Sequence, residues 1–117
     1  MGSIAVLPEV VEAVGGRARI IVDGAFTRGT DVIKAIALGA AAVAVGRLYV
    51  YGLAAASASG VVRLLEILED EIRIALGLLG VCGFAELDQS YVSTAPPIVR
   101  PSLHSAFPHL NLLPEPY

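Results

Sequence analysis

Residues 20–47 read IIVDGAFTRGTDVIKAIALGAAAVAVGR, and this stretch decides the fold of the chain. Two short apolar runs, Ile20 to Val22 and Ala41 to Val45, enclose a helical pattern that begins at an N-cap, Thr30, and closes at Gly39. Both runs are uniformly apolar, which is typical of strands in a parallel sheet covered on its two faces. The order strand, helix, strand predicts a βαβ unit and therefore a fold of the α/β class.

Two further helices are expected outside this unit. The stronger pattern runs from Ser59 to Leu79, and Gly80 is placed to end it. Apolar residues recur there at steps of three or four, at Val61, Leu65, Leu68, Ile72, Leu76 and Leu79. Its acidic residues predict a solvated face rather than a paired-carboxylate site: Glu66, Glu69, Asp70 and Glu71. An earlier helix is expected to open at Pro8, stop at Gly15-Gly16 and bury Val10, Val11 and Val14.

Composition excludes several classes of protein. The 117 residues are 56% apolar and 16% charged, with a mean hydropathy of +0.73, so the chain is more apolar than so short a domain can bury alone. A net charge of −3 argues against a general nucleic-acid binder. The single cysteine, Cys82, fits a reducing compartment, so we expect a cytoplasmic location. Residues 35–62 hold Arg47 as their only charge, but glycines interrupt the run, which favours a buried core over a membrane span.

The chain divides into a body and a tail near residue 92. Six of its seven prolines fall between Pro96 and Pro116, whereas no glycine lies beyond Gly83. Proline fixes φ and lacks a backbone donor, so we expect a folded unit over residues 1–92 and an extended Pro-rich tail over residues 93–117. The tail histidines, His104 and His109, have no carboxylate or cysteine at ligand spacing, and no metal site is predicted.

The loop after each predicted strand has residues suited to phosphate. Asp23-Gly24 opens the first loop, which continues through Ala25, Thr27 and Arg28, and Gly46-Arg47 forms the second. Glycine lets the backbone approach an anion closely, and arginine offers a planar fork of donors. In βα barrels, the loops after the last two strands commonly bind phosphate. By residue type alone, these residues are also consistent with an ordinary Asp-Gly turn and a surface arginine.

The residues of these loops and helices also form a longer connected pattern. It consists of Asp23-Gly24, Arg28-Gly29-Thr30-Asp31-Val32, Lys34-Ala35, Ala37-Leu38-Gly39-Ala40, Val43, Gly46-Arg47, Tyr51-Gly52-Leu53-Ala54-Ala55, Gly60-Val61, Asp70-Glu71 and Leu78-Leu79-Gly80-Val81. With this pattern the chain resembles the FMN-dependent α-hydroxy-acid oxidases and dehydrogenases, which include glycolate oxidase, lactate oxidase and mandelate dehydrogenase. The resemblance covers roughly residues 4–91.

The resemblance implies a (β/α)8 barrel that holds FMN at its C-terminal face and oxidises a 2-hydroxy acid. This chain would supply the C-terminal portion, namely the last two parallel strands with their helices. Asp23 and Gly24 would lie beside the ribityl-phosphate, with Ala25, Thr27 and Arg28 following in the same loop. Gly46 and Arg47 would grip the phosphate after the last strand. Tyr49 and Tyr51 are expected to pack in the outer layer of the barrel.

The chain departs from the family pattern at three places. The family usually has a second glycine where Ala25 stands and an arginine where Thr27 stands, and a proline where Leu48 stands. Its catalytic histidine belongs to a Ser-Asn-His-Gly-Gly-Arg-Gln segment that precedes the matching part, so we assign no catalytic residue and expect no turnover by this chain alone. Its partners would be the N-terminal part of the barrel or further copies of itself.

Two alternatives stay open at this level. Other phosphate-binding barrels, such as inosine-monophosphate dehydrogenase and type 2 isopentenyl-diphosphate isomerase, have a similar pair of glycine-rich loops. The chain also suits a non-catalytic half-barrel that acts as an assembly module, because two parallel strands leave unpaired edges and an apolar face. Bound flavin separates the enzyme part from the assembly module.

Overall fold

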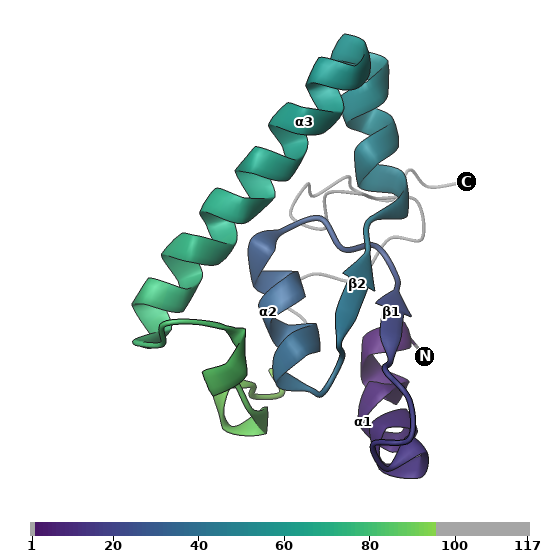
Figure 1. Cartoon of the computed structure of the whole chain (residues 1–117), viewed down its shortest axis with the longest axis vertical. Helices are drawn as coiled ribbons and strands as arrows, with labels where there is room; N and C mark the ends of the chain where they lie inside the picture. The colour runs from purple at the N-terminus through teal and green to yellow at the C-terminus, as the bar shows by residue number, and fades with distance from the viewer. Residues whose placement is uncertain (1, 96–117) are drawn as a thin grey trace, which may run out of the picture.

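Two short parallel strands form the centre of the fold. The structure, a computed structural model, describes residues 2–95; most of the predicted tail, including His104 and His109, lies outside the described residues. Strand β1 (Ile21–Asp23) pairs with β2 (Ala42–Ala44) in parallel, with Ile21 opposite Ala42 and Asp23 opposite Ala44. Helix α2 (Gly29–Ala37) connects the two strands (Figure 1). The predicted βαβ unit is confirmed.

Helix α2 begins two residues earlier than the sequence predicts. Arg28, not Thr30, is its N-cap residue, and its last helical residue is Ala37, with Leu38 as the C-cap. The reason is the carboxylate of Asp31, whose Oδ2 accepts the backbone N–H of Arg28 at 3.2 Å. This bond satisfies a donor that the first turn of a helix leaves without an intrahelical partner, so a side-chain oxygen from Thr30 is not required.

Helix α1 (Ser3–Val14) starts five residues before the position expected from Pro8, which lies inside it. The helix ends where predicted, at Gly15, whose φ of 55° is left-handed and whose N–H donates to Val11 O. Leu7 is buried, and Val11 and Val14 of the predicted stripe are half-buried, with Val11 packed against the core. Val10 is 39% exposed, so the prediction was wrong at Val10 alone. Proline removes one hydrogen bond from the middle of this helix.

Helix α3 (Gly46–Leu79) is two helical arms rather than one straight helix. The backbone leaves helical geometry at Ala56 and Ser57, and the chain turns back there, so the arms form the tall hairpin of Figure 1. The arms cross where Gly52 and Gly60 meet, and a Cβ on Gly52 would lie 2.8 Å from the carbonyl oxygen of Gly60. The second arm matches the predicted helix and ends at Gly80 as expected, and the first arm is the helix expected after Gly46-Arg47.

The turn in α3 also bears on the membrane question. By length and apolar composition α3 is long enough to cross a bilayer. The break divides it into residues 46–55 and 58–79. At about 1.5 Å per residue, the first arm extends roughly 15 Å, half of a hydrocarbon core of about 30 Å. The second arm carries charged residues along its whole middle: Arg63, Glu66, Glu69, Asp70, Glu71 and Arg73. The first arm is too short to span a bilayer, and the second arm carries too many charged residues to do so.

The core is small and leaves much apolar surface open. One cluster of buried side chains comes from α1, β1, α2 and the loops, namely Leu7, Val22, Phe26, Ala35 and Ala40. The other buried apolar residues of the described part are Val32, Ile33, Ala37, Leu68 and Val81. Ile21 on β1 is 69% exposed and Leu78 on α3 is 84% exposed. Within the described residues, the strands are therefore covered on one face only, whereas the sequence predicts cover on both.

Two short 3-10 helices follow α3. η1 (Phe84–Glu86) and η2 (Gln89–Tyr91) lie beside α2 at the lower end of the molecule (Figure 1). Asp88 caps η2, because its Oδ1 accepts the backbone N–H of Ser90 at 2.8 Å. The hydrogen bonds from the hydroxyl and N–H of Ser90 hold the pKa of Asp88 below its ordinary value.

Candidate functional site

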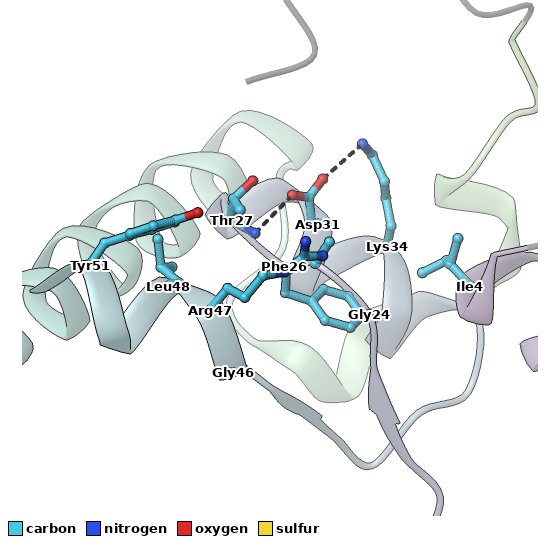
Figure 2. A pocket seen from close by; sticks show the side chains of 11 residues that line it. Ile4, Gly24, Phe26, Thr27, Asp31, Lys34, Gly46, Arg47, Leu48 and Tyr51 are labelled. Atoms are coloured by element: carbon cyan, nitrogen blue, oxygen red, sulfur yellow. Dashed lines mark hydrogen bonds and ion pairs between the residues drawn. The ribbon is translucent and has the colours of Figure 1, made fainter. Parts of the chain in front are cut away.

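The loops that follow the two strands meet at one pocket. Because β1 and β2 are parallel and in register, Asp23 and Ala44 end at the same edge of the sheet, and the chain leaving each strand turns toward the same space. The pocket there has a volume of about 360 Å³. Its lining, drawn in Figure 2, consists of Ile4, Gly24, Ala25, Phe26, Thr27, Asp31, Lys34, Gly46, Arg47, Leu48 and Tyr51.

At the N-terminus of α2, on one side of this pocket, carboxylates accept hydrogen bonds from three backbone N–H groups. Asp31 Oδ2 accepts the N–H of Thr27 at 3.4 Å and that of Arg28 at 3.2 Å. Glu71, on the second arm of α3, accepts the N–H of Gly29 at 2.7 Å through Oε2. The N–H groups of Thr27, Arg28 and Gly29 are therefore bound by the protein's own carboxylates rather than left for a phosphate.

The N-terminus of α3, at the other side, has no such cap. The N-cap residue is Val45, whose apolar side chain offers no acceptor, and Val45 is followed by Gly46, Arg47 and Leu48. The first N–H groups of a helix have no intrahelical partner, and the helix dipole adds partial positive charge there. This end of α3 has the properties of an anion site.

Two cationic side chains line the same space. Arg47 comes from the first turn of α3 and Lys34 from the last turn of α2. Lys34 Nζ lies 3.6 Å from Asp31 Oδ1, an ion pair that Figure 2 marks with a dashed line. Among the pocket residues the two cations outnumber the single carboxylate, so the charge of the lining favours an anion.

The backbone after β1 bends sharply at the pocket wall. Gly24 has a φ of 156° and Ala25 a φ of 54°, both in the region that favours glycine. For Ala25 this conformation is strained, since a left-handed residue with a Cβ costs about 1–2 kcal/mol. This strain is a physical reason for the glycine that the family pattern usually has at the position of Ala25.

The structure brings together most, but not all, of the residues predicted for the site. Gly24, Ala25, Thr27, Gly46 and Arg47 line the pocket. The other two predicted residues do not: Asp23 is exposed at the end of β1, and Arg28 directs its Nε toward Glu71 Oε1 at 3.4 Å. The side chain of Arg28 therefore does not take the place of the charge absent at Thr27.

Sequence reasoning missed four lining side chains that give the pocket its chemistry. They are Phe26, Asp31, Lys34 and Tyr51, the last of which was expected to pack outward. Lys34 follows Asp31 by three positions on α2, a spacing that places two side chains on one helix face and could have indicated the pair. Tyr51 lies about one turn beyond Leu48 on the first arm of α3.

A βαβ unit with a cationic pocket at the carboxyl ends of its strands defines the class of phosphate-binding α/β proteins. Comparison with known families identifies the particular group within this class. The model of the FMN-dependent dehydrogenase family matches residues 1–94, and the chain belongs to that family.

Individual relatives agree with this assignment. Human 2-hydroxyacid oxidase 1 is 48% identical over 94 residues, which are 80% of this chain and 25% of the relative. An L-lactate oxidase of Nostoc sp. is 40% identical over 92 residues, 79% of this chain and 25% of the relative. The chain thus spans about a quarter of the length of the curated relatives it matches.

Solved structures of similar proteins share the fold of the described residues. An oxidised active mutant of (S)-mandelate dehydrogenase superposes with a TM-score of 0.74 at 36% identity, covering 79% of this chain and 26% of its own. A mandelate oxidase mutant with an FMN adduct gives a TM-score of 0.68 at 49% identity, covering 70% and 26%.

The cofactor of this family is FMN, and the pocket fits its phosphate on chemical grounds. A helix N-terminus without a side-chain cap, the guanidinium of Arg47 and the ammonium of Lys34 are donors suited to a phosphate dianion. The apolar side chains of Ile4, Phe26 and Leu48 complete the lining.

Proposed function

We propose that this chain forms the C-terminal portion of a (β/α)8 barrel enzyme that oxidises 2-hydroxy acids with FMN, and that its pocket holds the FMN phosphate. The observation that carries the proposal is the N-terminus of α3, where no side chain caps the helix and Arg47 and Lys34 line the same pocket. The backbone N–H groups of Gly46, Arg47 and Leu48 would hold the phosphate together with the two cationic side chains. Membership of the family supports the redox assignment.

The open surface supports the barrel proposal. Ile21 on β1 is 69% exposed, and both strands are only three residues long, with an outer edge each. A two-stranded parallel sheet with one bare face is marginal alone, because parallel sheets are ordinarily covered on both faces. Further strands and helices of a barrel would complete the sheet, and they are the partner that we propose for this surface.

The reaction divides between the chain and the remainder of the barrel. Bound FMN supplies two-electron redox chemistry at its ring, so that a 2-hydroxy acid is oxidised to a 2-oxo acid. The residues of this chain bind and orient the cofactor through its phosphate. Both histidines of the sequence lie at positions 104 and 109, beyond the residues that the family model matches. We therefore propose that a polypeptide of these 117 residues does not turn over lactate, glycolate or mandelate unless another segment supplies the base.

Comparing two flavins tests the phosphate site directly. FMN and riboflavin differ by the phosphate, so a phosphate pocket binds FMN more tightly, and flavin fluorescence titrations of the 117-residue chain measure both affinities. Replacing Arg47 by Ala removes one charge-assisted contact worth about 1–3 kcal/mol, which weakens FMN binding roughly tenfold to a hundredfold. Riboflavin binding should hardly change.

Arg73→Ala is the matched control. Arg73 is also an exposed arginine of α3, but it pairs with Glu69 and Asp70 and does not line the pocket. Because the guanidinium of Arg73 is not part of the pocket lining, this variant should keep the wild-type preference for FMN. Equal affinities for FMN and riboflavin in the wild-type chain, or an unchanged preference in Arg47→Ala, would refute the phosphate assignment.

A second candidate, an assembly module, is favoured by the apolar residues that the described structure leaves exposed. Ile74 is 64% exposed and Leu78 84% exposed, both on the second arm of α3. Exposed apolar patches of this kind ordinarily drive association. A colourless, stable oligomer that binds neither flavin would favour this function over the enzymatic one. For either function, we propose a cytoplasmic location, which microscopy of a fluorescent fusion tests.

A further inference from the structure

One carboxylate of α3 reaches across the fold to the loop that forms the pocket. Of the four acidic residues expected on a solvated face, Glu66, Glu69 and Asp70 are exposed, but Glu71 is not, with 30% of its side chain accessible. Its two oxygens meet consecutive residues of the loop: Oε2 accepts the N–H of Gly29 at 2.7 Å, and Oε1 lies 3.4 Å from Arg28 Nε. Gly29 and Glu71 are 42 residues apart in the sequence.

The bond to the N–H of Gly29 is the stronger of the two contacts. Arg28 has a side chain that is 71% exposed, and exposed ion pairs contribute little because water screens them. Gly29 is buried, and a backbone donor buried without an acceptor carries a desolvation penalty. A short bond to a carboxylate oxygen meets that need, so the reach of the Glu71 side chain matters more than its charge.

The helices approach too closely at this point for any residue but glycine. A Cβ on Gly29 would lie 2.6 Å from the Cβ of Glu71 and 2.7 Å from the backbone N of Ile72. The start of α2 is thereby fixed against the backbone of α3, not merely against a flexible side chain. Thr27, two residues before Gly29, lines the pocket, so the position of this contact sets the position of one pocket wall.

Helix α3 also carries the opposite wall of the pocket. Gly46 and Arg47 begin the first arm of α3, Glu71 lies on the second arm, and the arms are in backbone contact where Gly52 meets Gly60. The path from one pocket wall to the other therefore runs through Glu71, along the second arm, across the glycine crossing and down the first arm. Both walls are held by one rigid hairpin.

We propose that Glu71 is a positioning residue of the FMN-phosphate pocket, which fixes the loop after β1 against α3 by accepting the N–H of Gly29. The inference rests on the proposed function for the identity of the ligand. It does not rest on that function for the placement of the loop, which can be measured without ligand.

Two conservative variants separate reach from charge. Glu71→Gln keeps the length of the side chain and an oxygen acceptor for Gly29, and loses the charge. Glu71→Asp keeps the charge and shortens the side chain by one methylene, so that the acceptor no longer reaches. We expect FMN binding to weaken about fivefold to tenfold in Glu71→Asp, the size of one hydrogen bond, and to stay within about twofold in Glu71→Gln.

Amide spectra of the ¹⁵N-labelled 117-residue chain give the readout that needs no flavin. In Glu71→Asp the amide resonances of Ala25, Thr27 and Gly29 should shift, whereas those of Gly15 and Gly16, at the end of α1, should not. Glu71→Gln should restore the wild-type positions at Ala25 and Thr27. Glu69→Asp is the control, because among the described residues Glu69 pairs with the exposed Arg73 alone, and it should leave the loop amides and the FMN affinity unchanged.

The outcomes distinguish this inference from the proposed function. If the wild-type chain binds no FMN, the proposed function fails, and the amide shifts alone decide the role of Glu71. Unchanged loop amides in Glu71→Asp would overturn the inference. So would the reverse order of the variants, with Glu71→Asp like the wild type and Glu71→Gln impaired, because that order would assign the effect to charge.

Discussion

Adding one methyl group at Gly29 should separate the pocket loop from α3. In Gly29→Ala the new Cβ would lie 2.6 Å from Glu71 Cβ and 2.7 Å from the backbone N of Ile72. The second neighbour is backbone in the middle of a helix, so it cannot rotate away as a side chain would. The first turn of α2 must therefore shift outward, which also lengthens the 2.7 Å bond from the N–H of Gly29 to Glu71.

The magnitude follows from three effects. Overpacking against a fixed neighbour costs about 1–3 kcal/mol, and a weakened hydrogen bond to a charged acceptor costs about 1.5 kcal/mol. Alanine regains about 0.5–1 kcal/mol over glycine within a helix. We expect a net loss of about 2–3 kcal/mol in the free energy of unfolding, which in a domain of this size lowers the melting temperature by roughly 10–20 °C.

Urea unfolding followed by circular dichroism measures this loss, and Gly77→Ala is its matched control. Gly77 also lies in a helix, but a Cβ there meets nothing within 4 Å, so alanine should stabilise the chain by about 0.5–1 kcal/mol. The two substitutions are chemically the same and should have opposite signs. A Gly29→Ala variant as stable as the wild type would refute the close approach of α2 and α3.

Three further substitutions test local features of the fold. Ser57 has a φ of 52° and a ψ of −140° at the turn of α3, a conformation suited to glycine. Ser57→Gly should therefore stabilise the chain by about 1 kcal/mol in urea unfolding. Ala54→Gly, in the regular first arm, should destabilise the chain by about 1 kcal/mol. Ala25→Gly relieves the left-handed strain at the pocket and should add about 0.5–1 kcal/mol of stability; a loss would show that the strain is not real. Ser90→Ala should raise the pKa of Asp88 toward its ordinary value in a carboxyl-carbon NMR titration, because the hydroxyl of Ser90 is the largest cause of the lowered pKa. A lowered pKa contributes stability above the ordinary pKa that is lost as pH falls through the folded-state value, so this variant should also flatten the acid limb of the stability curve.

The elements that local patterns describe were predictable from the sequence. The βαβ unit follows from two apolar runs around a capped helix, and Gly80 ends α3 in the left-handed conformation expected of a helix stop. Gly24, Gly46 and Arg47 reach the pocket because parallel strands bring the loops after them to one edge. Each of these inferences needs only neighbouring residues and the geometry of a parallel sheet.

The elements that depend on distant contacts were not predictable. The turn of α3 falls at Ala56 and Ser57, neither of which is a glycine or a proline, and the first arm is stabilised by the crossing of Gly52 with Gly60 rather than by its own periodicity. Arg28 points away from the pocket because Glu71, 43 positions later in the chain, attracts it. No local pattern reports a partner at that separation.

The small core has a thermodynamic consequence for the cofactor. Only ten apolar side chains are buried within the described residues, whereas a whole domain is ordinarily stable by about 5–15 kcal/mol. A ligand that binds only the folded state adds stability by mass action, about 2.7 kcal/mol when present at a hundred times its dissociation constant. FMN held between α2 and α3 would therefore contribute to the fold on the same scale as several core residues. The supply of flavin would then set how much of the chain is folded, as well as how much can take part in oxidation.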